Sequence, residues 1–112
     1  MIKLERRPME PALKSAVEAR LNRLLELIDA GIPPPQALLG AYRDPMLKAH
    51  LVAEAHGKCV YCESRITHVY FGDVEHIKPK AHFPEERLAV DNLVYACAIC
   101  NGAKGDYWDH AI

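Results

Sequence analysis

The sequence predicts an α+β fold, with helices in the N-terminal half and a metal-binding, strand-containing half after them. Three observations predict it: an amphipathic apolar stripe over residues 12–30, a segment rich in β-branched and aromatic residues at 66–74, and two C-x2-C pairs. With 112 residues, half of them apolar, the chain can build one globular core. We divide it into residues 1–57, an arm and a helical region, and residues 58–112, a metal-binding core.

Residues 1–11 carry several charges and two prolines, which predicts an extended arm. From residue 12 onward, apolar residues recur at helical spacing and predict a packing helix, with its stripe at Leu13, Val17, Leu21, Leu24, Leu25 and Ile28. The helix is expected to end near Ala30, because Gly31 can adopt a left-handed C-cap and the three prolines at 33–35 cannot continue a helix.

A short helix is expected from Gln36 to about Tyr42. The next helix has a clear start signal, because Asp44 can act as N-cap and Pro45 suits the first helical position. This helix is expected to stop at Gly57. Both of the longer helices are interpreted as packing elements.

The second half changes character at residue 58. Alternation over 66–74 predicts a strand, or a hairpin interrupted at Gly72, with His76 at or just past its end. Residues 77–90, broken by two prolines, are expected to form a long irregular loop. A short strand is predicted at 93–96, and the second cysteine pair is expected to lead into a helix.

The cysteines predict a metal site. Two C-x2-C pairs suit a tetrahedral four-sulfur site for zinc, with ligands Cys59, Cys62, Cys97 and Cys100. The 34 residues between the pairs exceed the roughly 15–20 of an ordinary zinc ribbon, which indicates that something substantial is inserted between them. A rubredoxin-like iron site, four free thiols and two disulfides are the alternatives.

Composition and charge exclude several classes of protein. No run of 18 apolar residues exists, so no transmembrane helix is predicted, and the first residues lack the apolar segment of a secretory signal. A cytoplasmic location is therefore expected. The formal net charge is −1, so any nucleic-acid binding would require the positive charge to gather on one face.

A polar cluster lies between the cysteine pairs. An exposed strand-end histidine, His76, can act as a general base, and the adjacent Glu75 offers the hard oxygen ligand that Mg²⁺ or Mn²⁺ prefers. Asn92, in a turn, can hold a backbone segment or an imidazole by hydrogen bonds. Asn101 directly follows the last cysteine, so the metal site would fix where its side chain points.

Order and spacing together carry a resemblance over residues 58 to about 106. The pattern C-x2-C, EHIKPK, DNL and C-x2-C-N-x2-K resembles the HNH endonucleases of the ββα-metal fold, in their four-cysteine zinc subtype. The opening MIKL with Pro8 and Pro11, together with HIKPK at 76–80, is further similar to the HNH proteins of retron and Septu anti-phage systems.

The resemblance implies a role for each matched residue. His76 would deprotonate the attacking water, and Asn92 would orient that histidine. Glu75 and Asn101 would ligate the catalytic Mg²⁺ or Mn²⁺, with Asp73 as a further contributor. Lysines 78, 80 and 104, and also Arg87, would contact the phosphate backbone of DNA.

Three functions are therefore weighed. The first is a DNA-cutting HNH nuclease that works in a defence system with an ATPase partner, docked on the helices at 12–30 and 44–56. The second is a non-catalytic zinc-ribbon module that binds nucleic acid or a partner protein. The third is a small electron-transfer protein, which visible colour would reveal. The retained His76, Asn92 and Asn101 favour the nuclease, since a structural ribbon needs none of them.

Overall fold

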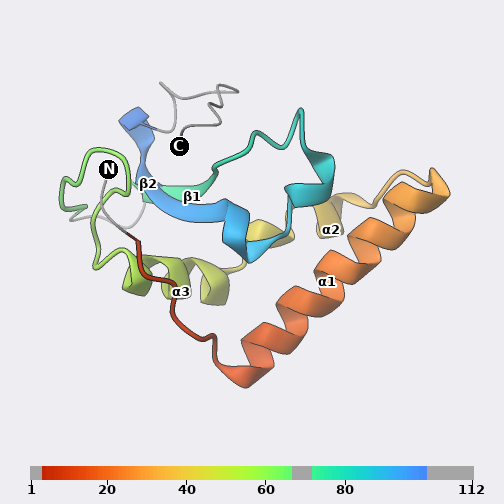
Figure 1. The fold of residues 1–112 in the computed structure, drawn as a ribbon, viewed down its shortest axis with the longest axis horizontal. Helices are drawn as coiled ribbons and strands as arrows, with labels where there is room; N and C mark the ends of the chain where they lie inside the picture. The colour runs from red at the N-terminus through yellow and green to blue at the C-terminus, as the bar shows by residue number, and fades with distance from the viewer. Residues whose placement is uncertain (1–3, 67–71, 101–112) are drawn as a thin grey trace.

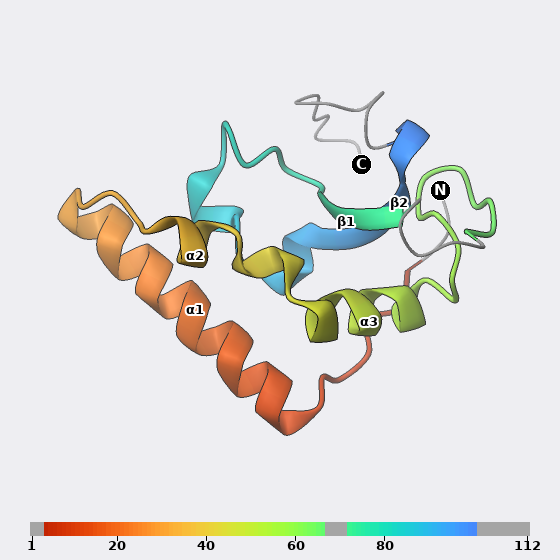
Figure 2. The same cartoon turned by 180° about the vertical axis from the view of Figure 1, so that it is seen from behind.

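The computed structural model describes residues 4–66 and 72–100 of the chain. Helices lie on one side of a two-stranded antiparallel sheet, and α1 runs diagonally along the edge of the molecule (Figures 1 and 2). The α+β prediction, with helices first and a small sheet after them, is confirmed. None of the helices in these described segments is both long enough and apolar enough to cross a bilayer.

The first helix, α1 (Pro11–Ala30), begins and ends where the sequence predicts. The Glu10 carboxylate caps its N-terminus, and Gly31 adopts a left-handed C-cap with φ of 71°. Its buried residues are Leu13, Val17, Leu24 and Leu27. The predicted stripe is wrong at its end, because Leu25 and Ile28 are 40% and 37% exposed. The C-terminal half of α1 lies along the edge of the molecule and packs through one side, where Leu24 and Leu27 are buried (Figure 1).

The expected short helix is divided into α2 (Gln36–Leu39) and a 3-10 turn, η1 (Ala41–Arg43). The next helix, α3 (Pro45–Glu54), starts as predicted. The Asp44 side chain accepts a hydrogen bond from the Met46 amide at 2.9 Å. This bond and the Arg20 guanidinium hold the pKa of Asp44 below its ordinary value. After α3 the chain turns at Gly57, whose φ of 71° suits glycine.

The sheet is a hairpin with a long connection. Strand β1 (Gly72–His76) pairs antiparallel with β2 (Leu93–Cys97), so that His76 faces Leu93 and Gly72 faces Cys97. A Cβ atom at position 72 would overlap the Tyr95 phenol ring, so the strand begins at a residue where only glycine fits. The predicted interruption at Gly72 is therefore the start of β1. Of the strand predicted at 66–74, residues 67–71 lie outside the described residues.

Residues 77–90 were expected to form an irregular loop, but the connection between β1 and β2 contains two single 3-10 turns, η3 (Pro84–Glu86) and η4 (Val90–Asn92). One hydrophobic core joins these parts. It includes Leu24 of α1, Leu51 of α3, and Val74 and Leu93 of the sheet, all of them buried. The helical region therefore supports the hairpin directly.

The N-terminal arm is attached through a buried carboxylate, Glu54, which is 3% exposed. Its two oxygens accept hydrogen bonds from the Arg6 guanidinium at 3.0 Å and the Arg7 amide at 2.8 Å, and His50 Nε2 lies 3.2 Å away. The Arg6 guanidinium also donates to the carbonyl oxygens of Asp91 and Leu93, the two neighbours of Asn92. The arm is thereby connected to both α3 and the start of β2.

We expect Glu54→Ala to lower the free energy of unfolding by about 1–3 kcal/mol, because it removes the buried carboxylate that accepts hydrogen bonds from the Arg6 guanidinium and the Arg7 amide. Urea denaturation would measure the loss. The matched control is Glu26→Ala, which removes an exposed pair with Arg23 and should change stability by less than about 0.5 kcal/mol. Equal stability losses in the two variants would contradict the anchoring role of Glu54.

Candidate functional site

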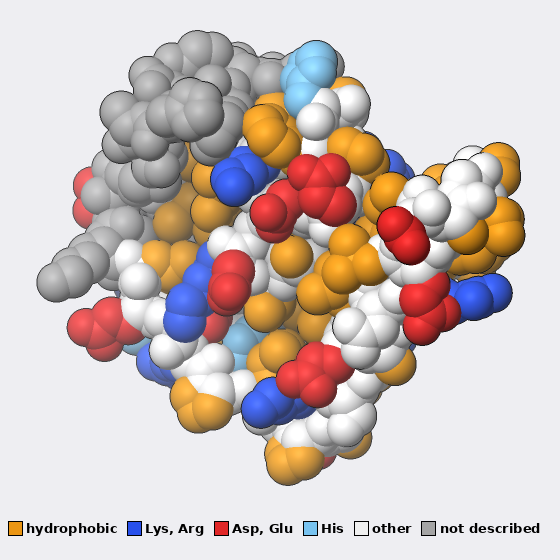
Figure 3. All heavy atoms as spheres, turned by 45° about the vertical axis from the view of Figure 1, so that its right-hand side comes forward, with side chains coloured by type: hydrophobic (Ala, Val, Ile, Leu, Met, Phe, Trp, Pro, Cys, Tyr) orange, Lys and Arg blue, Asp and Glu red, His pale blue; other side chains and the backbone are white. Residues whose placement is uncertain are grey.

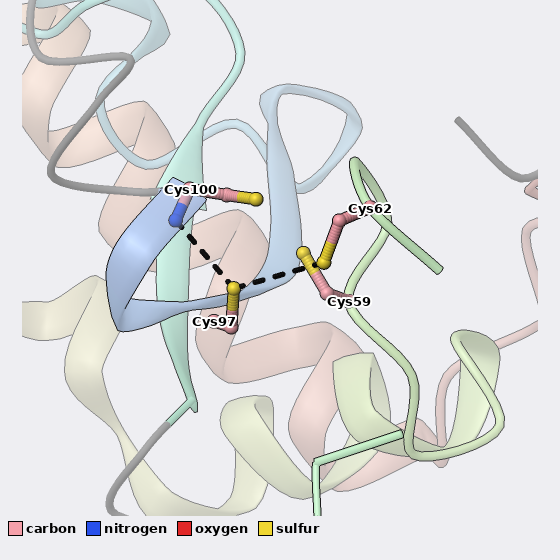
Figure 4. Close-up of side chains that lie close together, drawn as sticks. All are labelled: Cys59, Cys62, Cys97 and Cys100. Carbon is pink, nitrogen blue, oxygen red and sulfur yellow. Dashed lines mark hydrogen bonds between the residues drawn. The ribbon is translucent and has the colours of Figure 1, made fainter. Parts of the chain in front are cut away.

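The four cysteines meet as the sequence predicts. Their sulfur atoms all lie within 4.8 Å of one another, and Cys62 Sγ is 3.8 Å from Cys97 Sγ (Figure 4). Four thiolates around a tetrahedral zinc at the usual 2.3 Å would lie about 3.8 Å apart. The cluster therefore has the size of a structural zinc site, and iron would fit the same sulfur atoms.

The turn that carries the first cysteine pair is bonded to the sheet. The Val60 amide donates to the Tyr95 carbonyl oxygen of β2 at 3.0 Å. Within the turn, the Cys59 amide donates to the Ser64 carbonyl oxygen at 2.9 Å, and Glu63 adopts a φ of 62°. Cys97 ends β2, and the Cys100 amide lies 3.5 Å from its sulfur. The sheet thus fixes both pairs relative to each other.

The thiols differ in their acidity. Hydrogen bonds from Ser64 and then Cys59 lower the pKa of Cys62 to about 6. Burial, followed by hydrogen bonding with Cys97, raises the pKa of Cys100 to about 12. Since zinc binds thiolates, Cys62 is ready to coordinate at neutral pH, whereas Cys100 would release a proton on binding.

His76 ends β1 as predicted, but it is buried, with 5% of its surface exposed, and the expectation of an exposed histidine is wrong. Its Nε2 lies 2.9 Å from the Arg87 carbonyl oxygen. A carbonyl oxygen can only accept, so Nε2 carries the proton and the lone pair of the neutral ring lies on Nδ1. The Tyr42 ring packs edge-on against the imidazole, with 4.5 Å between ring centroids.

Asn92 is buried at the end of the loop and closes it. Its Oδ1 accepts from the Lys78 amide at 2.7 Å, and its Nδ2 donates to the carbonyl oxygens of Lys78 and Glu86, both at 3.1 Å. These bonds hold the backbone on both sides of the loop. The loop includes Arg87, whose carbonyl oxygen meets His76, so Asn92 supports the imidazole through the backbone.

Glu75 precedes His76 in β1 and is 6% exposed. Burial, followed by the negative charge of Glu75, raises the pKa of the Tyr61 phenol. The Tyr61 hydroxyl is buried and is the one such side-chain atom without a hydrogen-bond partner among the residues that the structure describes. A bound water would satisfy this hydroxyl. The Glu75 carboxylate is itself the kind of hard oxygen ligand that Mg²⁺ or Mn²⁺ prefers.

Residues 59–107 match the family model of the HNH endonucleases, from the first cysteine past the last one. Residues 59–107 therefore form a domain of the HNH endonuclease family. Over 103 residues, or 91% of its length, the chain is also 31% identical to "Septu protein PtuB" of Bacillus thuringiensis. The chain spans 37% of that relative. No solved structure matches it.

The remaining residues expected in the HNH site differ in their surroundings. Lys78 is half-exposed, and its Nζ lies 3.8 Å from Glu86 and over the Phe83 ring. Lys80 is exposed. Asn101 and Lys104 lie outside the described residues, so their predicted roles stay predictions.

Arg87 was expected to contact phosphate, but its guanidinium is otherwise engaged. Its Nε donates to the Leu39 carbonyl oxygen at 2.6 Å, and its charged end lies 5.5 Å from the centre of the Tyr42 ring. Arg87 thus links the HNH hairpin to the helical region. Neither its role nor that of Tyr42 follows from a local motif, because their contacts join distant parts of the chain.

Proposed function

We propose that this chain is a metal-dependent HNH endonuclease that hydrolyses phosphodiester bonds of DNA. The observation that supports it most is the hydrogen bonding of His76, which lies next to Glu75 in the matched HNH domain. Its Nε2 donates to a backbone carbonyl oxygen, so Nδ1 carries the lone pair. A neutral imidazole with a fixed ring and one basic nitrogen is what a general base requires.

In the proposed mechanism, His76 Nδ1 takes a proton from a water that attacks the scissile phosphorus atom in line with the leaving 3′ oxygen. The Arg87 carbonyl oxygen stabilises the imidazolium that forms, because it accepts a hydrogen bond from Nε2. Glu75 and Asn101 would hold Mg²⁺ or Mn²⁺, which supplies charge stabilisation to the phosphoryl and leaving oxygens. Asn92 keeps the loop, and therefore the carbonyl, in place.

The zinc ion would have a structural role at the four cysteines. Lys80, Lys78 and Lys104 would bind the DNA backbone, with Lys78 giving up its pairing to Glu86. On the face drawn in Figure 3, acidic and basic side chains are interspersed. This distribution and the net charge of −1 favour weak DNA binding by the chain itself.

Targeting would then come from a partner. We propose a cytoplasmic anti-phage defence role with an ATPase partner, supported by the similarity to the Septu protein. The helical region of residues 1–57, as distinct from the nuclease core of 58–112, would provide the docking surface. Leu25 and Ile28 near the end of α1 are exposed, and Ile32, just after the helix, is 52% exposed.

A non-catalytic zinc-ribbon module is the second candidate, because the burial of Glu75 and His76 is also what a structural role would produce. Cleavage of a supercoiled plasmid separates the two. With Mg²⁺ or Mn²⁺ and verified zinc content, we expect nicking that EDTA in the assay stops and that fresh divalent ion restores. Ligatable ends would indicate 5′-phosphate and 3′-hydroxyl products. Folded, zinc-loaded protein that leaves the plasmid intact, alone and with its ATPase partner, would overturn the nuclease function.

A further inference from the structure

The ring of Tyr42 covers the imidazole of His76 from the other half of the chain. Tyr42 lies in η1, between α2 and α3, and is 4% exposed. Its ring meets the imidazole at an interplanar angle of 74°, with 4.5 Å between centroids. Edge-to-face geometry of this kind is directional, so the contact restricts how the imidazole can turn about its Cβ–Cγ bond.

The same tyrosine is fixed by two cations. The guanidinium carbons of Arg43 and Arg87 lie 5.1 Å and 5.5 Å from the centre of its ring. Arg87 has three roles at this point: its side chain donates to the Leu39 carbonyl oxygen, its charge lies over Tyr42, and its own carbonyl oxygen meets His76 Nε2. The Tyr42 ring and the Arg87 carbonyl oxygen therefore both contact the imidazole, and the helical region fixes the position of each.

We infer that Tyr42 is a positioning residue for the general base, holding His76 in the rotamer and tautomer that keep Nε2–H on the Arg87 carbonyl oxygen. This inference rests on the proposed function and deepens it, since it makes the helical region part of the active site. Without the ring, a buried imidazole can rotate by half a turn and exchange its two nitrogens. Misplacement of a catalytic group by about 1 Å can cost about a hundredfold in rate.

Two substitutions distinguish the effect of the Tyr42 ring from that of its hydroxyl group. Tyr42→Leu removes the aromatic edge, and we expect kcat for plasmid nicking to fall about 10–100-fold while KM changes less than about threefold. Tyr42→Phe keeps the ring and is expected to retain the wild-type rate to within about threefold. The structural control is Leu24→Ala, which opens a cavity in the same core but leaves the Tyr42 ring in place.

A second measurement does not depend on cleavage. In ¹⁵N-histidine-labelled, zinc-loaded protein at about pH 8, long-range ¹H–¹⁵N correlations report which ring nitrogen carries the proton. The His76 signals are identified among six histidines by their loss in His76→Gln. We expect a single Nε2–H tautomer in wild type, Tyr42→Phe and Leu24→Ala, and a mixture in Tyr42→Leu.

The outcomes are distinct. A Tyr42→Leu variant with an unchanged tautomer overturns the inference, as does a Leu24→Ala variant with the same tautomer mixture, because loss of stability alone would then explain the effect. If wild type does not cut DNA, the proposed function fails, yet the tautomer spectra still decide whether Tyr42 holds the imidazole.

Discussion

Replacing His76 with alanine is expected to lower the rate of metal-dependent plasmid cleavage by about 10²–10⁴-fold, the usual contribution of a positioned general base. The large loss follows from the geometry at the end of β1. The Arg87 carbonyl oxygen fixes Nε2 as the donor, so Nδ1 is the nitrogen that can take a proton from water. No other histidine in the described part of the hairpin and its loop is buried, since His82 is exposed.

The controls follow from the same geometry. His82→Ala, in the same loop, should cut at the wild-type rate. Because His76 is buried against Tyr42, its removal also opens a cavity, so the alanine variant must be compared at a temperature where circular dichroism and zinc content match wild type. Added imidazole can fill the cavity and restore part of the rate. An alanine variant that cuts within threefold of wild type would contradict the assignment of the base.

Removing the metal from the cysteine cluster is expected to unfold at least residues 58–100, because zinc binding by small structural sites supplies an apparent 10–16 kcal/mol, roughly as much as a whole domain's stability. Cys59→Ala should give the same result, since Cys59 is fully buried in the turn that the metal would join to β2. Zinc content by mass spectrometry and thermal melting followed by circular dichroism would measure both effects.

The matched control is Ser64→Ala, which removes a side chain beside Cys62 but no sulfur ligand. It should keep one zinc per chain. Zinc displaces a proton from Cys100 at neutral pH, so its affinity should fall as the pH is lowered. The fall should become steeper below about pH 6, where the Cys62 thiolate is lost as well. A chain that loses all metal and keeps its melting temperature would contradict the structural role.

Features set by neighbouring residues could be predicted from the sequence. The cap of α1 at Gly31, the start of α3 at Asp44-Pro45 and the two cysteine turns depend on a few adjacent residues with specific chemistry, and the structure has all of them. The spacing of the cysteine pairs also predicted an insertion, which is the hairpin carrying Glu75 and His76.

The long-range contacts that hold the site in place could not be predicted from adjacent residues. Arg6 reaches Glu54 and the carbonyl oxygens beside Asn92, and Tyr42 reaches His76, across more than thirty positions of sequence in each case. A single arginine or tyrosine in a helical region has many possible partners, and only the folded chain selects one. The burial of His76 was missed for the same reason, because the residues that cover it lie in the other half of the chain.

The hydrogen bonds by which Asn92 holds the loop have a consequence for evolution. Each bond from its side chain goes to a main-chain atom, the amide or carbonyl of Lys78 and the carbonyl of Glu86. Main-chain atoms are the same whatever side chain a residue carries. Substitutions at the exposed positions 80–82 can therefore accumulate without moving the histidine, as long as the asparagine remains. This arrangement lets related chains diversify what the loop touches while the chemistry beneath it stays constant.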